Sequence, residues 1–154
     1  MKFRSYQFFY LLSVVLIIAT LCSTLMQFVE TSGATNELTN FKLIISNDKV
    51  SFAPVALGVV LIITGLVNLF GFVVAGFRNF ELQKRVSILG MLLISGYYLL
   101  LGIYAWVLST SSAIMELPLL FPFFVLVFNA LAFFAARRTE AAILAKASNF
   151  RLRD

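Results

Sequence analysis

The residues of this chain best placed to do chemistry inside a membrane are four uncharged polar side chains in long apolar runs: Asn68, Tyr97, Tyr98 and Asn129. At 1.5 Å of helical rise per residue, the two asparagines lie about 15 and 12 Å from the basic ends of their runs. We expect them to hydrogen-bond to each other across two helices, or alternatively to bind a small polar solute. At least one of the two tyrosine hydroxyls requires a protein partner.

Catalysis requires groups that this sequence lacks. It has no His, a single Cys (Cys22), and no Asp or Glu within the apolar runs. Enzymes that act inside a membrane need titratable or metal-binding groups at depth. Zinc ligation by the usual side chains needs several Cys or His residues. Nucleophile–histidine catalysis needs a His beside the nucleophile. We therefore expect no catalytic, cofactor-binding or metal-binding residue, and a protein that is not an enzyme.

Four stretches without Lys, Arg, Asp or Glu position these side chains: Ser5–Val29, Val50–Phe77, Val86–Met115 and Leu117–Ala136. A helix needs about 20 mostly apolar residues to cross roughly 30 Å of hydrocarbon. The composition, 61% hydrophobic and 12% charged, is typical of a compact helical membrane protein. We predict an all-α integral membrane protein with one domain, 1–154. It is a four-helix bundle with spans at about 6–28, 54–77, 86–108 and 117–136.

The basic residues determine the predicted orientation, because Lys and Arg stay on the cytoplasmic side of a membrane. All but two of the 12 lie in the head, the second connection or the tail, 137–154. The exceptions, Lys42 and Lys49, lie in the outer loop, 30–51. Both termini are therefore predicted to be cytoplasmic. The first apolar run exceeds the roughly 7–15 residues of a signal-peptide core, so we expect a retained span.

Two segments outside the spans show patterns of their own. In the outer loop, Phe41–Ile45 and Val50–Phe52 flank a turn-forming centre, which predicts a short hairpin. In the tail, Ile143, Ala147 and Phe150 recur at helical spacing, with basic residues on another side. This pattern predicts an amphipathic helix that continues the fourth span or lies on the inner leaflet.

The basic residues of the second connection and the tail form the candidate cytoplasmic docking surface: Arg78, Lys84, Arg85, Arg137, Arg138, Lys146, Arg151 and Arg153. The net charge of +5 is what the orientation rule already requires beside membrane spans. We therefore expect attraction to anionic membrane lipid and no nucleic-acid partner.

Three stretches resemble a family of small four-span bacterial inner-membrane proteins known as a domain of unknown function. They are Leu82–Arg85 before the third span, Arg137–Glu140 after the span that contains Asn129, and Ser148–Arg153, with its Arg-Leu-Arg ending. The resemblance covers essentially the whole chain. It implies the fold and a bacterial inner-membrane location, and it implies no activity.

These observations predict a non-enzymatic accessory or structural subunit that packs against a larger membrane complex. Its expected partners are membrane lipid and other integral membrane subunits, and no cofactor is expected. The alternative is a small transporter, or a lipid- or solute-binding protein, with a site near Asn68, Asn129, Tyr97 and Tyr98. Channels and carriers usually show a polar pathway or broken helices, and neither is evident in this sequence.

Overall fold

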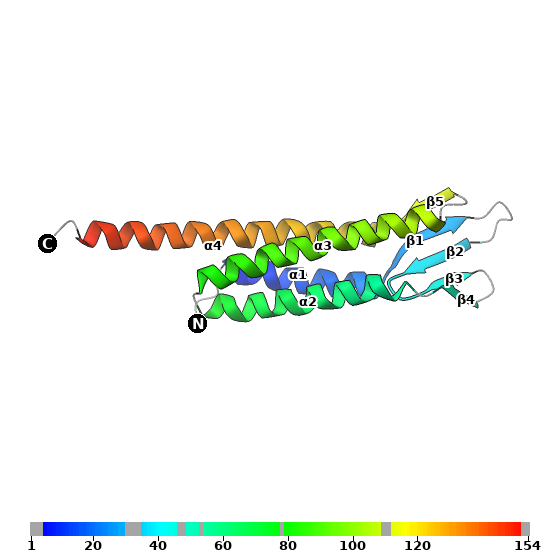
Figure 1. The fold of residues 1–154 in the computed structure, drawn as a ribbon, viewed down its shortest axis with the longest axis horizontal. Coiled ribbons are helices and arrows are strands. Elements are labelled where there is room, and N and C mark those ends of the chain that lie inside the picture. Colours follow the sequence, from blue (N-terminus) through cyan, green and yellow to red (C-terminus); the bar gives the residue numbers. More distant parts are fainter. Residues whose placement is uncertain are drawn as a thin grey trace.

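A computed structural model describes residues 5–29, 35–45, 49–52, 54–77, 79–108 and 112–151, which form a helical bundle with a sheet at one end (Figure 1). The helices are α1 (Ser5–Leu21), α2 (Val55–Gly76), α3 (Phe80–Leu108) and α4 (Phe121–Arg151), with a 3-10 turn, η1 (Leu117–Leu120), before α4. The strands are β1 (Thr24–Val29), β2 (Thr35–Thr39), β3 (Leu43–Ile45), β4 (Lys49–Phe52) and β5 (Ser112–Met115).

Within the described ranges, three helical segments are long and apolar enough to cross a membrane: Val55–Gly76, Phe80–Val107 and Leu117–Lys146. A fourth, Tyr6–Leu21, is apolar but shorter. Large apolar side chains such as Leu66, Leu92 and Leu99 are more than half exposed on these helices. Lipid solvates such surfaces and water does not, so the structure indicates a membrane-associated helical bundle.

The four helices pack as a ring in which α1 and α3 each contact both α2 and α4. α1 therefore lies diagonally opposite α3, and α2 lies diagonally opposite α4. α1 and α2 approach each other closely at Gly71, where a Cβ atom would lie 2.7 Å from Cε1 of the buried Tyr10 ring. Small residues permit such approach between membrane helices.

The first helix is shorter than the predicted span, 6–28, and that prediction is wrong at its outer end. α1 ends at Leu21, and the following turn is closed by the Cys22 N–H, which donates to the Ile18 carbonyl (3.2 Å). β1 then begins at Thr24 and pairs with β2 on one side and β5 on the other. The charge-free run could not reveal this boundary, because the partners of β1 come from distant parts of the sequence.

The sheet has five antiparallel strands in the order β4-β3-β2-β1-β5. The predicted hairpin corresponds to β3 and β4, which pair Leu43 with Phe52, but it is not a separate two-stranded unit. Its turn, 46–48, lies outside the described residues. β5 comes from the connection between α3 and α4, so the sheet joins two connections. The Gln27 Nε2 on β1 also donates to Glu116 Oε1, beyond β5 (2.5 Å).

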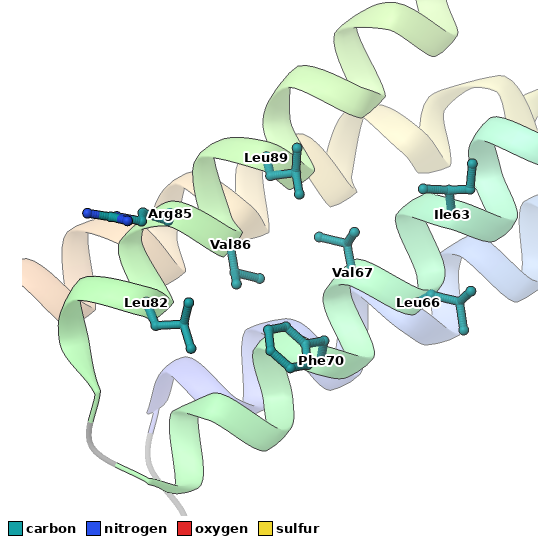
Figure 2. A pocket seen from close by; sticks show the side chains of 8 residues that line it. All are labelled: Ile63, Leu66, Val67, Phe70, Leu82, Arg85, Val86 and Leu89. Atoms are coloured by element: carbon teal, nitrogen blue, oxygen red, sulfur yellow. The ribbon is translucent and has the colours of Figure 1, made fainter.

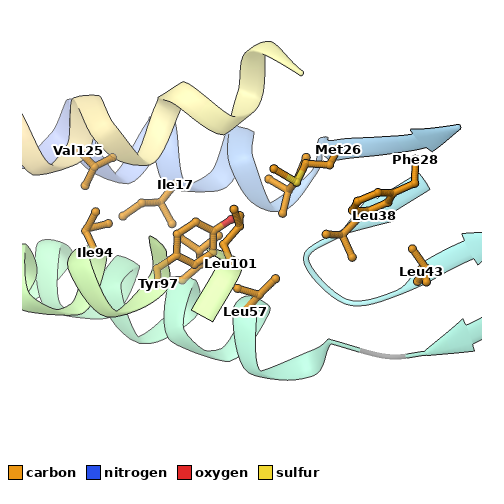
Figure 3. Packing of buried hydrophobic residues seen from close by; sticks show 12 residues of the cluster. Ile17, Met26, Phe28, Leu38, Leu43, Leu57, Ile94, Tyr97, Leu101 and Val125 are labelled. Carbon is orange, nitrogen blue, oxygen red and sulfur yellow. The ribbon is translucent and has the colours of Figure 1, made fainter. Parts of the chain in front are cut away.

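One hydrophobic cluster runs from the bundle into the sheet (Figure 3). Each helix contributes buried side chains to it, and so do β1, β2 and β3. Its members include Ile17, Leu57, Tyr97 and Val125 from the helices and Met26, Phe28, Leu38 and Leu43 from the strands. Because the cluster is continuous, the sheet and the half of the bundle next to it bury their apolar surfaces together.

At the opposite end, α4 continues well beyond the other helices (Figure 1). It has 31 residues and runs without a break to Arg151. Of the two predicted arrangements of the tail, the structure has the one in which the tail continues the last helix. We call the projecting segment, 137–151, the α4 extension.

Gly71→Ala is expected to lower the stability of the detergent-solubilised protein by about 1–3 kcal/mol, because the new methyl group would overlap the Tyr10 ring. The measurement is thermal or denaturant unfolding. Gly96→Ala is the matched control, since a Cβ atom there meets nothing within 4 Å and alanine favours a helix. Equal stability of the two variants would contradict this close approach.

Candidate functional site

Asn40, between β2 and β3, connects the sheet to three helices. Its side chain is 0% exposed. Its Nδ2 donates to the Thr20 carbonyl at the end of α1 (2.7 Å), and its Oδ1 accepts from the Tyr97 hydroxyl on α3 (3.0 Å). Its backbone carbonyl accepts from the Gly58 N–H in the first turn of α2 (3.0 Å). Helices leave such terminal groups without partners, so this single residue caps α1 and α2 from outside.

The two adjacent tyrosines both find protein partners, as the sequence predicted for at least one of them. Tyr98 donates to the Leu119 carbonyl in η1 (2.8 Å), and its ring meets that of Tyr97 edge-on at 5.7 Å. Tyr97 therefore holds α3 to the β2–β3 connection, while Tyr98 holds α3 to the start of α4. Each of the two hydroxyls therefore forms a hydrogen bond that joins two elements of the fold.

The predicted hydrogen bond between Asn68 and Asn129 does not form, and that prediction is wrong. Each Nδ2 donates to its own helix, to the Thr64 carbonyl (2.9 Å) and the Val125 carbonyl (3.0 Å) respectively. The helices that carry them, α2 and α4, lie diagonally across the ring. Asn129 faces α3, where a Cβ atom at Gly90 would lie 2.8 Å from its Oδ1. Both Oδ1 atoms are buried without a hydrogen-bond partner among the described residues.

A second buried polar cluster, which the sequence analysis missed, lies in the half of the bundle away from the sheet. The Tyr10 hydroxyl donates to the Gln83 carbonyl (3.3 Å) and lies 2.6 Å from Ser87 Oγ, which serves as the donor in that contact. The Gln83 side chain is fully buried, and neither of its polar atoms has a hydrogen-bond partner among the described residues. The spacing of Gln83, Ser87 and Gly90 places all three on one face of α3, a signal that was available in the sequence.

Charged side chains gather where α3 begins and α4 leaves the bundle. Lys84 Nζ bonds to Glu81 (2.9 Å) on its own helix and to Glu140 (3.0 Å) on α4. These groups precede Val86, where the charge-free run begins. The hydrogen bond from Lys84 lowers the pKa of Glu81. The pKa of Lys84 is raised mainly by its hydrogen bond to Glu81 and, to a smaller extent, by its hydrogen bond to Glu140. The ion pair with Glu140 fixes the base of the α4 extension to α3.

The other predicted docking residues are distributed over this end of the molecule. Arg85 lies one residue beyond Lys84 on α3, and Arg137, Arg138 and Lys146 lie along the α4 extension; all four are exposed. Arg151 is the last residue of α4. Arg78 and Arg153 lie outside the described residues. The structure therefore brings Lys84 and Arg85 close to the start of the extension, and the remaining residues follow along it.

The chemistry of these sites is hydrogen bonding and charge pairing. The buried groups are hydroxyls and amides, which carry no charge. Within the part of the chain that the structure describes, no cluster of three or more His, Cys, Asp or Glu side chains could hold a metal ion. The free Cys22 is exposed on the turn after α1.

Comparison with protein families confirms the predicted resemblance to a family of unknown function. The family model described as a domain of unknown function, DUF4293, matches residues 6–146. This stretch includes nearly all of α1, both connections that form the sheet, and α4 as far as Lys146. No curated protein matches the chain.

A double-mutant cycle tests the connection through Asn40. We expect Tyr97→Phe to destabilise the protein by about 1–3 kcal/mol, because it leaves the Asn40 Oδ1 buried without a donor. Asn40→Ala should cost at least as much. The double variant should be less destabilised than the sum of the two, by about 0.5–3 kcal/mol. Ser95→Ala, which removes an exposed hydroxyl bonded only to the Met91 carbonyl of its own helix, is the control. Additive effects of the pair would contradict this connection.

Proposed function

This chain belongs to the DUF4293 family, a domain of unknown function, and we propose from its own structure that it is a non-enzymatic accessory subunit of a larger complex in the bacterial inner membrane. In this proposal α1 crosses the membrane together with α2, α3 and α4. Both termini are cytoplasmic, and the sheet faces outward. α1, at 17 residues, is at the lower limit of about 17–25 residues for a spanning helix.

The distribution of charge supports this orientation. Arg85, Arg137, Arg138 and Lys146 all lie at or beyond the end of the bundle that is away from the sheet. Lys42 lies at the sheet, between β2 and β3. Since Lys and Arg collect on the cytoplasmic side, the end that carries the α4 extension is the cytoplasmic one.

The observation that carries the proposal is the exposed apolar surface on the α4 extension. Residues 141–146 are all exposed, and Leu144 is 64% exposed. Most of the stability of a helix in a protein comes from packing of its apolar side. A helix that projects alone lacks this stabilisation until its apolar side contacts a partner. Because Lys84 and Glu140 fix its base, the extension is held in one direction. It offers Ile143 and Leu144 to a groove on another subunit.

The placement of polar groups also favours a binding role over catalysis. The buried hydroxyls and amides mostly bond to backbone carbonyls, as Ser13, Thr20 and Thr64 do. The carboxylates Glu81 and Glu140 are both paired with Lys84 at a helix end. Neither arrangement provides a general base that faces an internal site.

A second candidate function, binding or transport of a small solute inside the bundle, is favoured by a different observation. The Oδ1 atoms of Asn68 and Asn129 and the side-chain amide of Gln83 are buried without hydrogen-bond partners among the described residues. A solute with both hydrogen-bond donors and acceptors would satisfy them. Its copurification with the wild-type chain, and its loss from Asn129→Leu, would favour this function over the first.

The test of the accessory role is affinity purification of the full chain from its native membrane in mild detergent, followed by quantitative mass spectrometry. We expect a stoichiometric membrane-protein companion. The double variant Ile143→Gln/Leu144→Gln should lose it without loss of thermal stability, because both side chains are exposed.

The matched control is Ile114→Gln/Met115→Gln, which changes two exposed apolar residues at the sheet end and should retain the companion. A wild-type protein that elutes alone, or equal loss from both double variants, would contradict docking through the α4 extension.

A further inference from the structure

We infer that the groove between α2 and α3 binds one anionic phospholipid, with an acyl chain along the groove and the phosphate on Arg85. The site is separate from the α4 extension and from the buried polar clusters. The ligand is assigned to the cytoplasmic leaflet because of the proposed orientation. The groove and its charge do not depend on that orientation or on any partner subunit.

The groove has a volume of about 420 Å³, within the range of roughly 300–1,000 Å³ for ligand sites. Its walls are apolar side chains from two helices. Figure 2 shows Val67 and Phe70 on α2 across from Leu82, Val86 and Leu89 on α3. Between Phe70 and Ile63, the groove extends along α2 for about 10 Å. These dimensions and this lining suit a flexible hydrocarbon chain.

Arg85 is the charged residue that lines the groove. It is exposed and makes no salt bridge within the described segments, whereas Lys84 beside it is bound by both Glu81 and Glu140. The charge of Arg85 does act on Glu81, but that carboxylate is hydrogen-bonded to Lys84. The guanidinium group is therefore available to a further anion. Its planar donors match a phosphate in a bidentate geometry.

The order of these groups along the membrane normal matches a phospholipid. Arg85 immediately precedes the charge-free run that begins at Val86, so it lies at the level of the head groups. The apolar walls continue from there into the hydrocarbon, past Leu89 on one helix and Val67 on the other. A cation at the head-group end of an apolar groove complements an anionic head group followed by an acyl chain. A helix of another protein that occupied the groove in place of the lipid would have to place a carboxylate beside Arg85.

The test is native mass spectrometry of the purified, delipidated full chain with an equal mixture of phosphatidylglycerol and phosphatidylcholine. We expect one phosphatidylglycerol to be retained in preference to phosphatidylcholine. Arg85→Gln should reduce that preference about fivefold, the contribution of one basic residue at an anionic surface. Lys42→Gln, the same loss of one positive charge from an exposed residue at the sheet end of the molecule, should leave the preference unchanged. Val67→Phe, which fills the groove and keeps Arg85, should lower retention of both lipids.

Several results would overturn the inference. They are equal retention of the two lipids by the wild type, an unchanged preference in Arg85→Gln, and an equal loss of preference in Lys42→Gln, which would indicate general attraction. A dimer that Val67→Phe abolishes would show that a second copy of the chain occupies the groove. Thermal unfolding of each variant separates these results from misfolding. The lipid preference is measured on the purified chain alone, so it does not depend on whether a companion protein is found in the docking experiment.

Discussion

Hydrocarbon offers the polypeptide no hydrogen-bond partner, and this constraint explains where each kind of structure occurs in the chain. The long apolar segments are helices, which satisfy their own backbone. Many of the polar side chains buried among them turn back to a carbonyl one turn earlier: Ser13 to Phe9, Thr64 to Val60 and Asn129 to Val125. Strands would expose unpaired edges in lipid, and the five strands among the described residues lie together at one end of the bundle (Figure 1). Polar groups in the bundle therefore serve mainly to complete helices and to join them.

The same constraint requires hydrogen-bond partners at the helix ends that meet the sheet. The last carbonyls of α1 and the first N–H groups of α2 have no partners within their helices, and Asn40 bonds to one of each. Tyr97 reaches the same asparagine from α3, and Tyr98 ties α3 to η1 ahead of α4. All four helices are thus fixed in position where the sheet begins. At the other end, the ion pair of Lys84 with Glu140 joins α3 to α4, and α4 alone continues.

The sequence was most informative where a single physical signal decides the structure. Missing charges marked the apolar helices, although Thr24–Val29 is equally free of charge and forms a strand, because its partners β2 and β5 come from elsewhere in the chain. A protein partner was correctly predicted for at least one of the Tyr97 and Tyr98 hydroxyls. The partner of Tyr97 could not be identified, because it lies at a loop position, Asn40, that no periodicity marks. The prediction of an Asn68–Asn129 hydrogen bond was wrong because the depth of a residue in the membrane does not reveal which helices lie diagonally across the bundle.

The proposed docking and lipid surfaces both lie at the end of the molecule opposite the sheet, so the account depends on that end being cytoplasmic. This orientation can be measured with two variants in a Cys22→Ser background, one with Lys42 and one with Lys146 replaced by cysteine. Each variant is treated with a membrane-impermeant maleimide in intact spheroplasts. The account predicts labelling at position 42 in intact spheroplasts, and at position 146 only after permeabilisation. Labelling of position 146 from outside, with position 42 protected, would contradict it.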